Sequence, residues 1–230
     1  MIKLDKVTKG FGDKVVINNL SIEFYPNKVS AIIAPNGSGK TTLISILSGL
    51  MLADKGNINF INPYYQDEVV IILAGEKNLY MKNTVKENLI YFGTIRGLKI
   101  GNIQKLIDYY KEFFPLYNDI ENQLVEKLSY GQKRLVSIMT AVVSNAKCII
   151  IDEASEGLDM YYVSILKKLL IELKKERIVI ITAHDYGFVS DVSDTVMILK
   201  DGKIINNCNN ISKEALIEIY TENFGLEIER

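Results

Sequence analysis

The stretch that decides the fold runs from residue 29 to residue 47 and reads VSAIIAPNGSGKTTLISIL. It opens with a short apolar run, residues 29–34, which is typical of a buried β-strand. A glycine-containing loop follows, and apolar residues then recur at helical spacing as far as Gly49. A strand, a glycine-rich loop and a helix in this order predict a loop whose backbone N–H groups bind phosphate.

The loop itself supplies the candidate phosphate contacts. Its glycines let backbone N–H groups turn inward, and the N-terminus of the following helix adds its dipole. We expect Lys40 to reach the β- and γ-phosphates and the Thr41 hydroxyl to bind Mg²⁺. Ala34 stands where such loops have a glycine, and because it ends the strand we expect a backbone that alanine adopts without strain. The residues of this segment expected to contact the nucleotide are Ala34, Pro35, Asn36, Gly37, Ser38, Gly39, Lys40, Thr41 and Thr42. The alternative is a glycine-rich turn that holds no ligand.

Two carboxylates follow another apolar run. Residues 148–151 are apolar and lead directly into Asp152 and Glu153. Ligands of parallel α/β sheets bind at the carboxyl ends of the strands, so we expect both side chains to project toward the phosphate loop. Asp152 suits Mg²⁺, which is a hard ion that takes oxygen ligands, and Glu153 is then free to polarise an attacking water. The alternative is a solvated strand end.

The single histidine of the chain, His184, follows a third apolar run that begins at Ile178. A histidine that stands alone in a sequence is more often structural than catalytic. His184, however, comes after the next predicted strand, at the same edge of the sheet as Asp152. We therefore interpret it as a group that faces the γ-phosphate, on the strength of its position.

Apolar runs elsewhere predict a fold built on sheets. Two N-terminal segments, residues 2–7 and 15–24, alternate apolar and polar side chains as antiparallel strands do. Buried strands that alternate with helices indicate a parallel α/β sheet, and Asp201-Gly202 predicts a hairpin turn. The further strands are expected at residues 56–61, 69–73, 147–151, 178–182 and 196–199, and helices at residues 161–175 and 212–224.

An all-helical insert interrupts this alternation. From Thr84 the apolar period becomes helical, and Glu87 completes a capping box. A second helical pattern is stopped by Pro115, and the insert ends at about Glu126. Most of its aromatic residues are expected in a small core of their own, whereas Tyr80, which precedes the helix cap, is the better candidate for an exposed groove. The aromatic set is Tyr80, Tyr91, Phe92, Tyr109, Tyr110, Phe113, Phe114 and Tyr117.

The bulk composition excludes several classes of protein. The formal net charge of −1 does not indicate a nucleic-acid partner. Cys148 and Cys208 have no metal-ligand spacing, which fits a reducing cytoplasm. The start of the chain is no apolar targeting segment, and the longest apolar runs are far shorter than the roughly 18–20 residues that cross a bilayer. A role at a membrane would therefore require a partner chain.

One more string completes an ordered set of motifs. Residues 128–134 read LSYGQKR and open a helix. Together with the phosphate loop, the acidic strand end and the histidine, this string resembles the ABC ATPases, whose signature motif normally reads Leu-Ser-Gly-Gly-Gln. The resemblance covers residues 2–202. It implies that Ser129, Gly131 and Gln132 bind the γ-phosphate held by an opposite subunit, at a helix N-terminus.

The resemblance also implies roles for three single residues. Asp159 lies in a Gly-Leu-Asp loop that signals across the dimer in the family. Phe11 lies in a Lys-Gly-Phe-Gly turn and matches the aromatic residue that stacks on adenine. His184 matches the histidine that senses the γ-phosphate.

For the whole chain, the resemblance implies one ABC ATPase domain over residues 1–230. Its fold would be α/β, a P-loop NTPase (RecA-like) core with an antiparallel β N-terminal lobe and an all-helical sub-lobe at about residues 84–131. Two subunits, identical or different, would form a head-to-tail dimer around two molecules of ATP with Mg²⁺. Hydrolysis, with Glu153, Lys40 and His184 as catalytic residues, would drive a separate transmembrane permease.

The same resemblance implies a location, since the chain would be peripheral at the cytoplasmic face of the cell membrane. The docking surface is a hypothesis from the residues themselves. The chain has no span of its own, and the helical insert interrupts the α/β pattern and carries the dense aromatic set. We therefore expect the insert, from Thr84 to about Glu126, and the preceding residues 74–83 to dock the permease. We expect no long C-terminal regulatory domain, and in this the chain looks like the ATPase of a simple exporter.

The sequence departs from the family pattern at three positions. Tyr130 replaces a signature glycine, so the backbone there must have an ordinary φ. Ala154 replaces a proline. Gly75, followed by Glu76, stands where the family has a glutamine, and Gln66 lies before the preceding strand and cannot be that residue. Two other functions therefore stay open: a cytosolic ABC ATPase without a transport role, and an ATP-binding regulatory subunit with weak hydrolysis.

Overall fold

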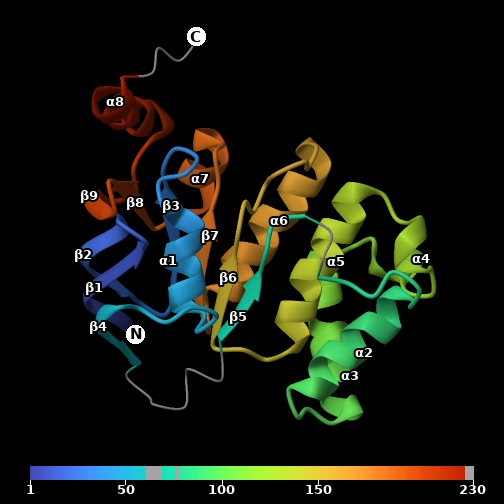
Figure 1. Cartoon of the computed structure of the whole chain (residues 1–230). Coiled ribbons are helices and arrows are strands. Elements are labelled where there is room, and N and C mark those ends of the chain that lie inside the picture. Colours follow the sequence, from blue (N-terminus) through green and yellow to red (C-terminus); the bar gives the residue numbers. More distant parts are fainter. Residues whose placement is uncertain (61–68, 76–77, 226–230) are drawn as a thin grey trace.

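The computed structural model describes residues 1–60, 69–75 and 78–225 (Figure 1). The smaller of its sheets is antiparallel, as the sequence predicts, with the order β2-β1-β4. These strands are β1 (Ile2–Phe11), β2 (Lys14–Phe24) and β4 (Lys55–Phe60). β1 continues past its predicted end at Val7. The prediction was too short because register shifts between Leu4 and Val7, and again between Val7 and Lys9, break the alternation of apolar and polar residues that marks a regular strand. The predicted last residue of β4, Ile61, lies outside the described residues.

The main sheet has the strand order β5-β6-β7-β3-β8-β9. Neighbouring strands from β5 to β8 are parallel, and β9 is antiparallel to β8. The predicted hairpin turn joins β8 to β9, where Asp201 and Gly202 both have a positive φ, as a two-residue turn of this kind requires. The strands are β3 (Lys28–Ile33), β5 (Val69–Ile72), β6 (Cys148–Ile151), β7 (Ile178–Thr182), β8 (Thr195–Lys200) and β9 (Lys203–Asn209).

Each face of the main sheet belongs to a different hydrophobic core. In β6, Cys148 and Ile150 join the core that contains α1 (Lys40–Leu47) and the inward face of the small sheet. Ile149 and Ile151 join the second core, on the opposite face. The helices of that second face are α5 (Tyr130–Val143), α6 (Met160–Leu173), α7 (Tyr186–Val192) and α8 (Lys213–Phe224). Burial on both faces explains the continuous apolar runs of the sequence.

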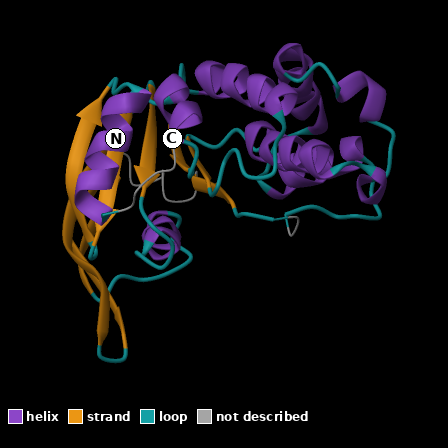
Figure 2. Cartoon of the chain, turned by 90° about the horizontal axis from the view of Figure 1, so that it is seen from above, coloured by secondary structure: helices purple, strands orange, loops and turns teal. Residues whose placement is uncertain are grey.

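The insert after β5 is helical, as predicted. It contains α2 (Val85–Ile95), α3 (Ile100–Tyr110) and the short α4 (Tyr117–Ile120), with α5 beside them. The predicted capping box is present, because the Thr84 Oγ1 accepts from the backbone N of Glu87 at 3.2 Å and the Thr84 N donates to the Glu87 Oε2 at 2.7 Å. Figure 2 shows most of the helices gathered at one side of the molecule and the strands at the other.

Two predictions about helices were wrong or incomplete. The helical pattern toward Pro115 does not continue to that residue, since α3 ends at Tyr110 and a 3-10 turn over Lys111–Phe113 replaces its last turn. α7 was not predicted, because its seven residues include a glycine and two polar residues and show no clear apolar period. Within the described residues, no helix is both long enough and apolar enough to cross a bilayer.

Candidate nucleotide-binding site

The phosphate loop connects β3 to α1 and has the backbone that an anion site needs. Gly37 and Gly39 have φ values of +78° and +100°, which side chains with a Cβ rarely adopt. A Cβ on Gly39 would also lie 2.9 Å from Cγ1 of Val16. Ala34 is fully buried and is not among the residues with positive φ, so the expectation of an unstrained alanine there is confirmed.

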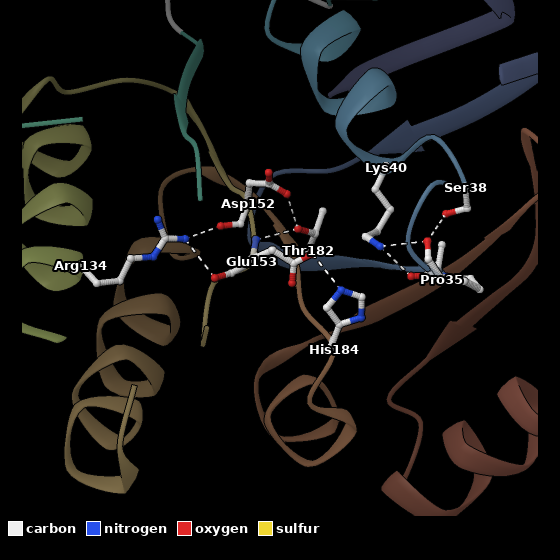
Figure 3. Close-up of polar contacts among 9 residues, drawn as sticks. Pro35, Ser38, Lys40, Arg134, Asp152, Glu153, Thr182 and His184 are labelled. Carbon is white, nitrogen blue, oxygen red and sulfur yellow. Dashed lines mark hydrogen bonds and ion pairs between the residues drawn. The ribbon is translucent and has the colours of Figure 1, made fainter. Parts of the chain in front are cut away.

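Lys40 lies folded over the loop that precedes it (Figure 3). Its Nζ donates to the backbone oxygens of Ala34 at 2.6 Å and Pro35 at 3.2 Å, and the Ser38 Oγ donates to the same Pro35 oxygen at 2.6 Å. Burial lowers the pKa of Lys40, while the charges of Glu153 and Asp152 oppose this shift. The carbonyls only accept from this ammonium, so its donors can turn to a phosphate instead.

Asp152 and Glu153 lie at the carboxyl end of β6, where Thr182 at the end of β7 holds both. The Thr182 Oγ1 donates to the Asp152 Oδ1 at 2.7 Å and accepts from the backbone N of Glu153 at 2.7 Å. Thr182 is fully buried. Thr182 was not among the predicted site residues, because its only local signal is a single hydroxyl at the end of an apolar run.

Glu153 combines an unusual backbone with a perturbed carboxyl group. Its φ of +48° places a long side chain in the left-handed region, a strained conformation that clusters at functional sites. The Nε2 of His184 lies 3.1 Å from the Glu153 Oε1. Burial raises the pKa of Glu153, and the nearby His184 and Lys40 act in the opposite direction.

Lys40, Glu153 and part of the phosphate loop line a cavity of about 420 Å³. Asp152, Thr182 and His184 are not among its lining residues, but Thr182 and His184 contact Glu153 and Thr182 also binds Asp152. Phe11, at the end of β1, lines the cavity and is 51% exposed. The Asp54 carboxylate accepts from the Lys9 Nζ at 2.7 Å and from the Gly10 backbone N at 2.8 Å, and so fixes the backbone directly before Phe11. The other lining residues are Lys14, Val16, Asn36, Gly37, Gly39, Lys40, Thr41, Thr42 and Glu153.

The donors around this cavity fit a nucleoside triphosphate and a hard cation. The left-handed glycines and the N-terminus of α1 favour phosphate groups, and Phe11 offers a flat face to a base. Thr41 and Asp152 supply a hydroxyl and a carboxylate, which are the oxygen ligands that Mg²⁺ takes.

The signature residues do not join this cavity. Ser129 caps α5: its Oγ accepts from the backbone N of Gln132 at 3.3 Å, and its own N donates to the Gln132 Oε1 at 2.9 Å. Asp159 caps α6 in the same way, accepting from the backbone N of Tyr162 at 3.0 Å. Ser129, Gly131, Gln132 and Asp159 are all absent from the lining of the phosphate-loop cavity.

Tyr130, the departure from the family signature, packs against the loop before α6. It is the first residue of α5 and does not have a positive φ, so the predicted ordinary backbone is confirmed. A Cβ on Gly157 would lie 2.4 Å from the Cε1 of Tyr130, and one on Gly131 would lie 2.5 Å from the Cδ2 of Tyr162. The ring of Tyr130 therefore fills the space beside Gly157, and the ring of Tyr162 fills the space beside Gly131.

Arg134 enters the site from α5 and was not among the predicted site residues. Only 3% exposed, it donates from Nη1 to the Leu73 oxygen at 2.8 Å and from Nη2 to the backbone oxygens of Asp152 and Glu153 (Figure 3). The available signal was a basic residue next to an apolar run that includes Leu135 and Val136.

The position of the missing family glutamine has its own geometry. Gly75 has a φ of +85°, which a glutamine would rarely adopt, so the backbone here is suited to glycine. Glu76 and Gln66, the other two residues considered for this role, lie outside the described residues.

A strand, a glycine-containing phosphate loop and a helix on a parallel sheet, with paired carboxylates at the next strand end, define an ATPase of the P-loop class. The model of the family described as ABC transporter matches residues 17–156, and the chain belongs to this family.

Individual relatives agree with this assignment over most of the chain. An uncharacterized ABC transporter ATP-binding protein of Methanocaldococcus jannaschii is 32% identical over 89% of this chain and 76% of its own. The structure of cbiO1 from Clostridium perfringens, part of the ABC transporter complex cbiONQ, has a TM-score of 0.81 at 26% identity and is matched over 96% of this chain and 92% of its own. The chain is therefore an ATP-binding ABC-type ATPase that powers a transporter.

The relatives do not agree on the direction of transport. The ribose import ATP-binding protein RbsA of Bacillus subtilis is 30% identical, over 99% of this chain and 48% of its own. The Nod factor export ATP-binding protein I of a Rhizobium species is 28% identical, over 99% and 75%. Since relatives of similar identity serve import and export, the expected exporter type stays a prediction.

Proposed function

We propose that the chain works as a head-to-tail dimer, with an identical or a related ATPase subunit. Each ATP would lie between the phosphate loop of one subunit and the Ser129, Gly131 and Gln132 of the other, with Asp159 at the boundary. The observation that carries this proposal is that one chain does not bring these two halves together. Asp152 and His184 are joined to the cavity through Thr182 and Glu153, whereas Ser129, Gln132 and Asp159 bond within their own helix caps and lie outside the lining. The N-terminus of the 14-residue helix α5 provides a second anion-binding end for the γ-phosphate.

In the proposed reaction, Glu153 orients the attacking water and takes its proton as the water oxygen bonds to the γ-phosphorus. The bond from that phosphorus to the leaving ADP oxygen breaks. Lys40 and His184 hold the γ-phosphate, and stabilisation of its charge is the main catalytic contribution in such chemistry. Thr41 and Asp152 would hold Mg²⁺, which neutralises charge on the β- and γ-phosphates when bound. The raised pKa of Glu153 makes it a stronger base than an exposed glutamate.

Glu153→Gln tests this assignment. The amide keeps the size of the side chain and cannot take a proton, so hydrolysis should fall at least about 100-fold while ATP still binds. Size-exclusion chromatography with ATP should then show an accumulated dimer. Glu156→Gln, a neighbouring exposed glutamate, is the matched control and should hydrolyse ATP at the normal rate. Undiminished hydrolysis by Glu153→Gln would remove Glu153 from the catalytic role.

We further propose that a separate transmembrane permease docks in the groove between β5 and α2, which would make the chain peripheral at the cytoplasmic face of the membrane. This groove has a volume of about 560 Å³ and includes Asn78, Tyr80, Phe92 and Arg96 in its lining. Tyr80 is 48% exposed and forms an edge-to-face pair with Tyr91, at 4.7 Å between ring centroids. Exposed, mutually braced aromatic rings are favoured anchors for a partner. Both lie within the insert and loop, residues 74–126, for which docking was expected.

A further inference from the structure

Arg134 joins the ends of two neighbouring strands. Its guanidinium donates to Leu73, directly after β5, at 2.8 Å, and to Glu153, after β6, at 3.0 Å. It also donates to the Asp152 oxygen between them in the chain. The side chain comes from α5, so a single residue of the helical side ties together two loops of the sheet.

The Leu73 oxygen is shared with a residue of the groove. The Nδ2 of Asn78 donates to it at 2.9 Å, and Asn78 lines the groove of about 560 Å³. Three consecutive hydrogen bonds therefore lead from the groove wall through Leu73 and Arg134 to the backbone of Glu153. Gly75, between Leu73 and Asn78 in the chain, has no side chain that could provide another route.

Of the residues joined by these hydrogen bonds, Glu153 is the one whose position would affect catalysis. Its left-handed backbone is held on one side by Thr182, which accepts from its N at 2.7 Å, and on the other by Arg134. A sparsely populated conformation persists only where the surroundings over-determine it. Loss of the contact to the Glu153 oxygen would therefore let the peptide rotate and move the carboxylate.

We propose that Arg134 is a positioning residue that links the permease-facing groove to the catalytic carboxylate Glu153. A partner that displaces Asn78 would move the Leu73 oxygen, and Arg134 would transmit that movement to Glu153. This inference rests on the proposed function, and it assigns Arg134 no contact with ATP.

Arg177 provides a control for a merely structural role. It is 4% exposed, donates from Nη1 to the backbone oxygen of Val142 at 3.1 Å, and lies 5.5 Å from the ring centroid of Tyr110. It thus resembles Arg134 in burial and in binding a carbonyl, but it has no contact with the site residues in the described part of the chain.

The experiment compares Arg134→Lys and Arg177→Lys in ATP hydrolysis, ATP binding by calorimetry and thermal melting. An ammonium cannot reproduce the planar fork that reaches three carbonyls. We expect Arg134→Lys to lower kcat about 10- to 100-fold, since small displacements of catalytic groups have effects of this size, with KM for ATP unchanged within about twofold. Arg177→Lys should lower the melting temperature and leave kcat within about twofold. Equal kcat for the two variants would overturn the proposal.

Asn78→Ala tests the same path from the groove side, and its thermal melting shows whether the fold is kept. We expect kcat to fall several-fold in the otherwise unchanged protein and to show no further fall in the Arg134→Lys background, because residues in one hydrogen-bond network act non-additively. An unchanged kcat for Asn78→Ala, or independent effects of the two changes, would overturn the proposal. If the unchanged chain binds ATP and never hydrolyses it, the proposed hydrolysis fails first and the positioning role fails with it.

Discussion

At the scale of single residues, Glu153 bears two unfavourable features at once. Its carboxylate is partly buried and its backbone is left-handed, and the first of these raises its pKa. A carboxyl group whose pKa is higher in the folded than in the unfolded protein makes the fold less stable as pH rises through that range. Selection for a base at this position thus works against stability.

Glu153→Gln should therefore be more stable than the unchanged protein at neutral pH. The gain expected from relieving a functional site is about 1 kcal/mol, and it should disappear below about pH 4, where both side chains are neutral. Thermal melts from pH 4 to pH 8 measure it, with Glu156→Gln as the control for loss of an exposed charge. A gain that is constant across this range would show that the burial of the carboxylate is not the cause.

Phe11 permits a second test at this scale. Its ring is half exposed at the mouth of the phosphate-loop cavity, as a residue that stacks on a base would be. Phe11→Ala should weaken ATP binding by about 1–3 kcal/mol, measured by titration calorimetry. Tyr25→Ala, which removes another exposed ring outside the lining of that cavity, should leave the affinity unchanged. Equal affinities for all three proteins would return Phe11 to the role of an exposed turn residue.

At the scale of elements, α5 and the loop before α6 form one packed unit through Tyr130 and Gly157. Gly157→Ala meets two obstacles, a φ of +68° and the Tyr130 ring. The left-handed backbone alone costs about 1–2 kcal/mol for alanine, and the steric conflict should add to it. In a Tyr130→Gly background only the backbone contribution should remain, which urea unfolding can measure. If Gly157→Ala has the same effect in both backgrounds, the ring does not brace this loop.

Most elements could be predicted from the sequence because their signals are local. Strands buried on both faces read as apolar runs, and Thr84 with Glu87 marks the start of α2 in four residues. Elements with weak local signals were not predicted or were predicted with the wrong length. α7 has no apolar period, and the register shifts of β1 interrupt the alternation that would have shown its full length.

The site divides in the same way. The phosphate loop and the acidic strand end are each formed by consecutive residues, so their chemistry can be predicted from the sequence. Thr182 and Arg134 act on backbone atoms 29 and 19 residues away from them, at Glu153, and these contacts exist only once β6, β7 and α5 have packed. No local sequence pattern predicts such a contact between a side chain and a distant backbone atom.

At the scale of the whole molecule, the proposed permease can be sought by cross-linking. A cysteine at Lys82, two residues after the groove-lining Tyr80, would replace a side chain that is 82% exposed. Cys208 is changed to serine, and Cys148 stays because it is buried. In native membranes, Lys82→Cys should give a specific adduct with a polytopic membrane protein. Lys203→Cys, on β9 at the opposite edge of the main sheet, should give none.

The opposite result would change the functional assignment. A chain that purifies without membranes and cross-links through Lys82→Cys only to itself or to ribosomes would favour the cytosolic ABC ATPase over the transport subunit. The boundaries of the helical sub-lobe, residues 84–131, stay a prediction that such mapping would also refine.

The order of strands in the main sheet has a consequence for folding during synthesis. β3, which leads into the phosphate loop, pairs with β7 and β8, whose residues are made long after it. At about 5–20 residues per second of synthesis, the wait from the end of β3 to the start of β7 is roughly 7–29 s. During that time the growing chain carries the complete phosphate-loop sequence, but β3 has neither of its partner strands. ATP can therefore stabilise the finished subunit and cannot guide its early folding, and a chain cut before residue 178 should bind no nucleotide.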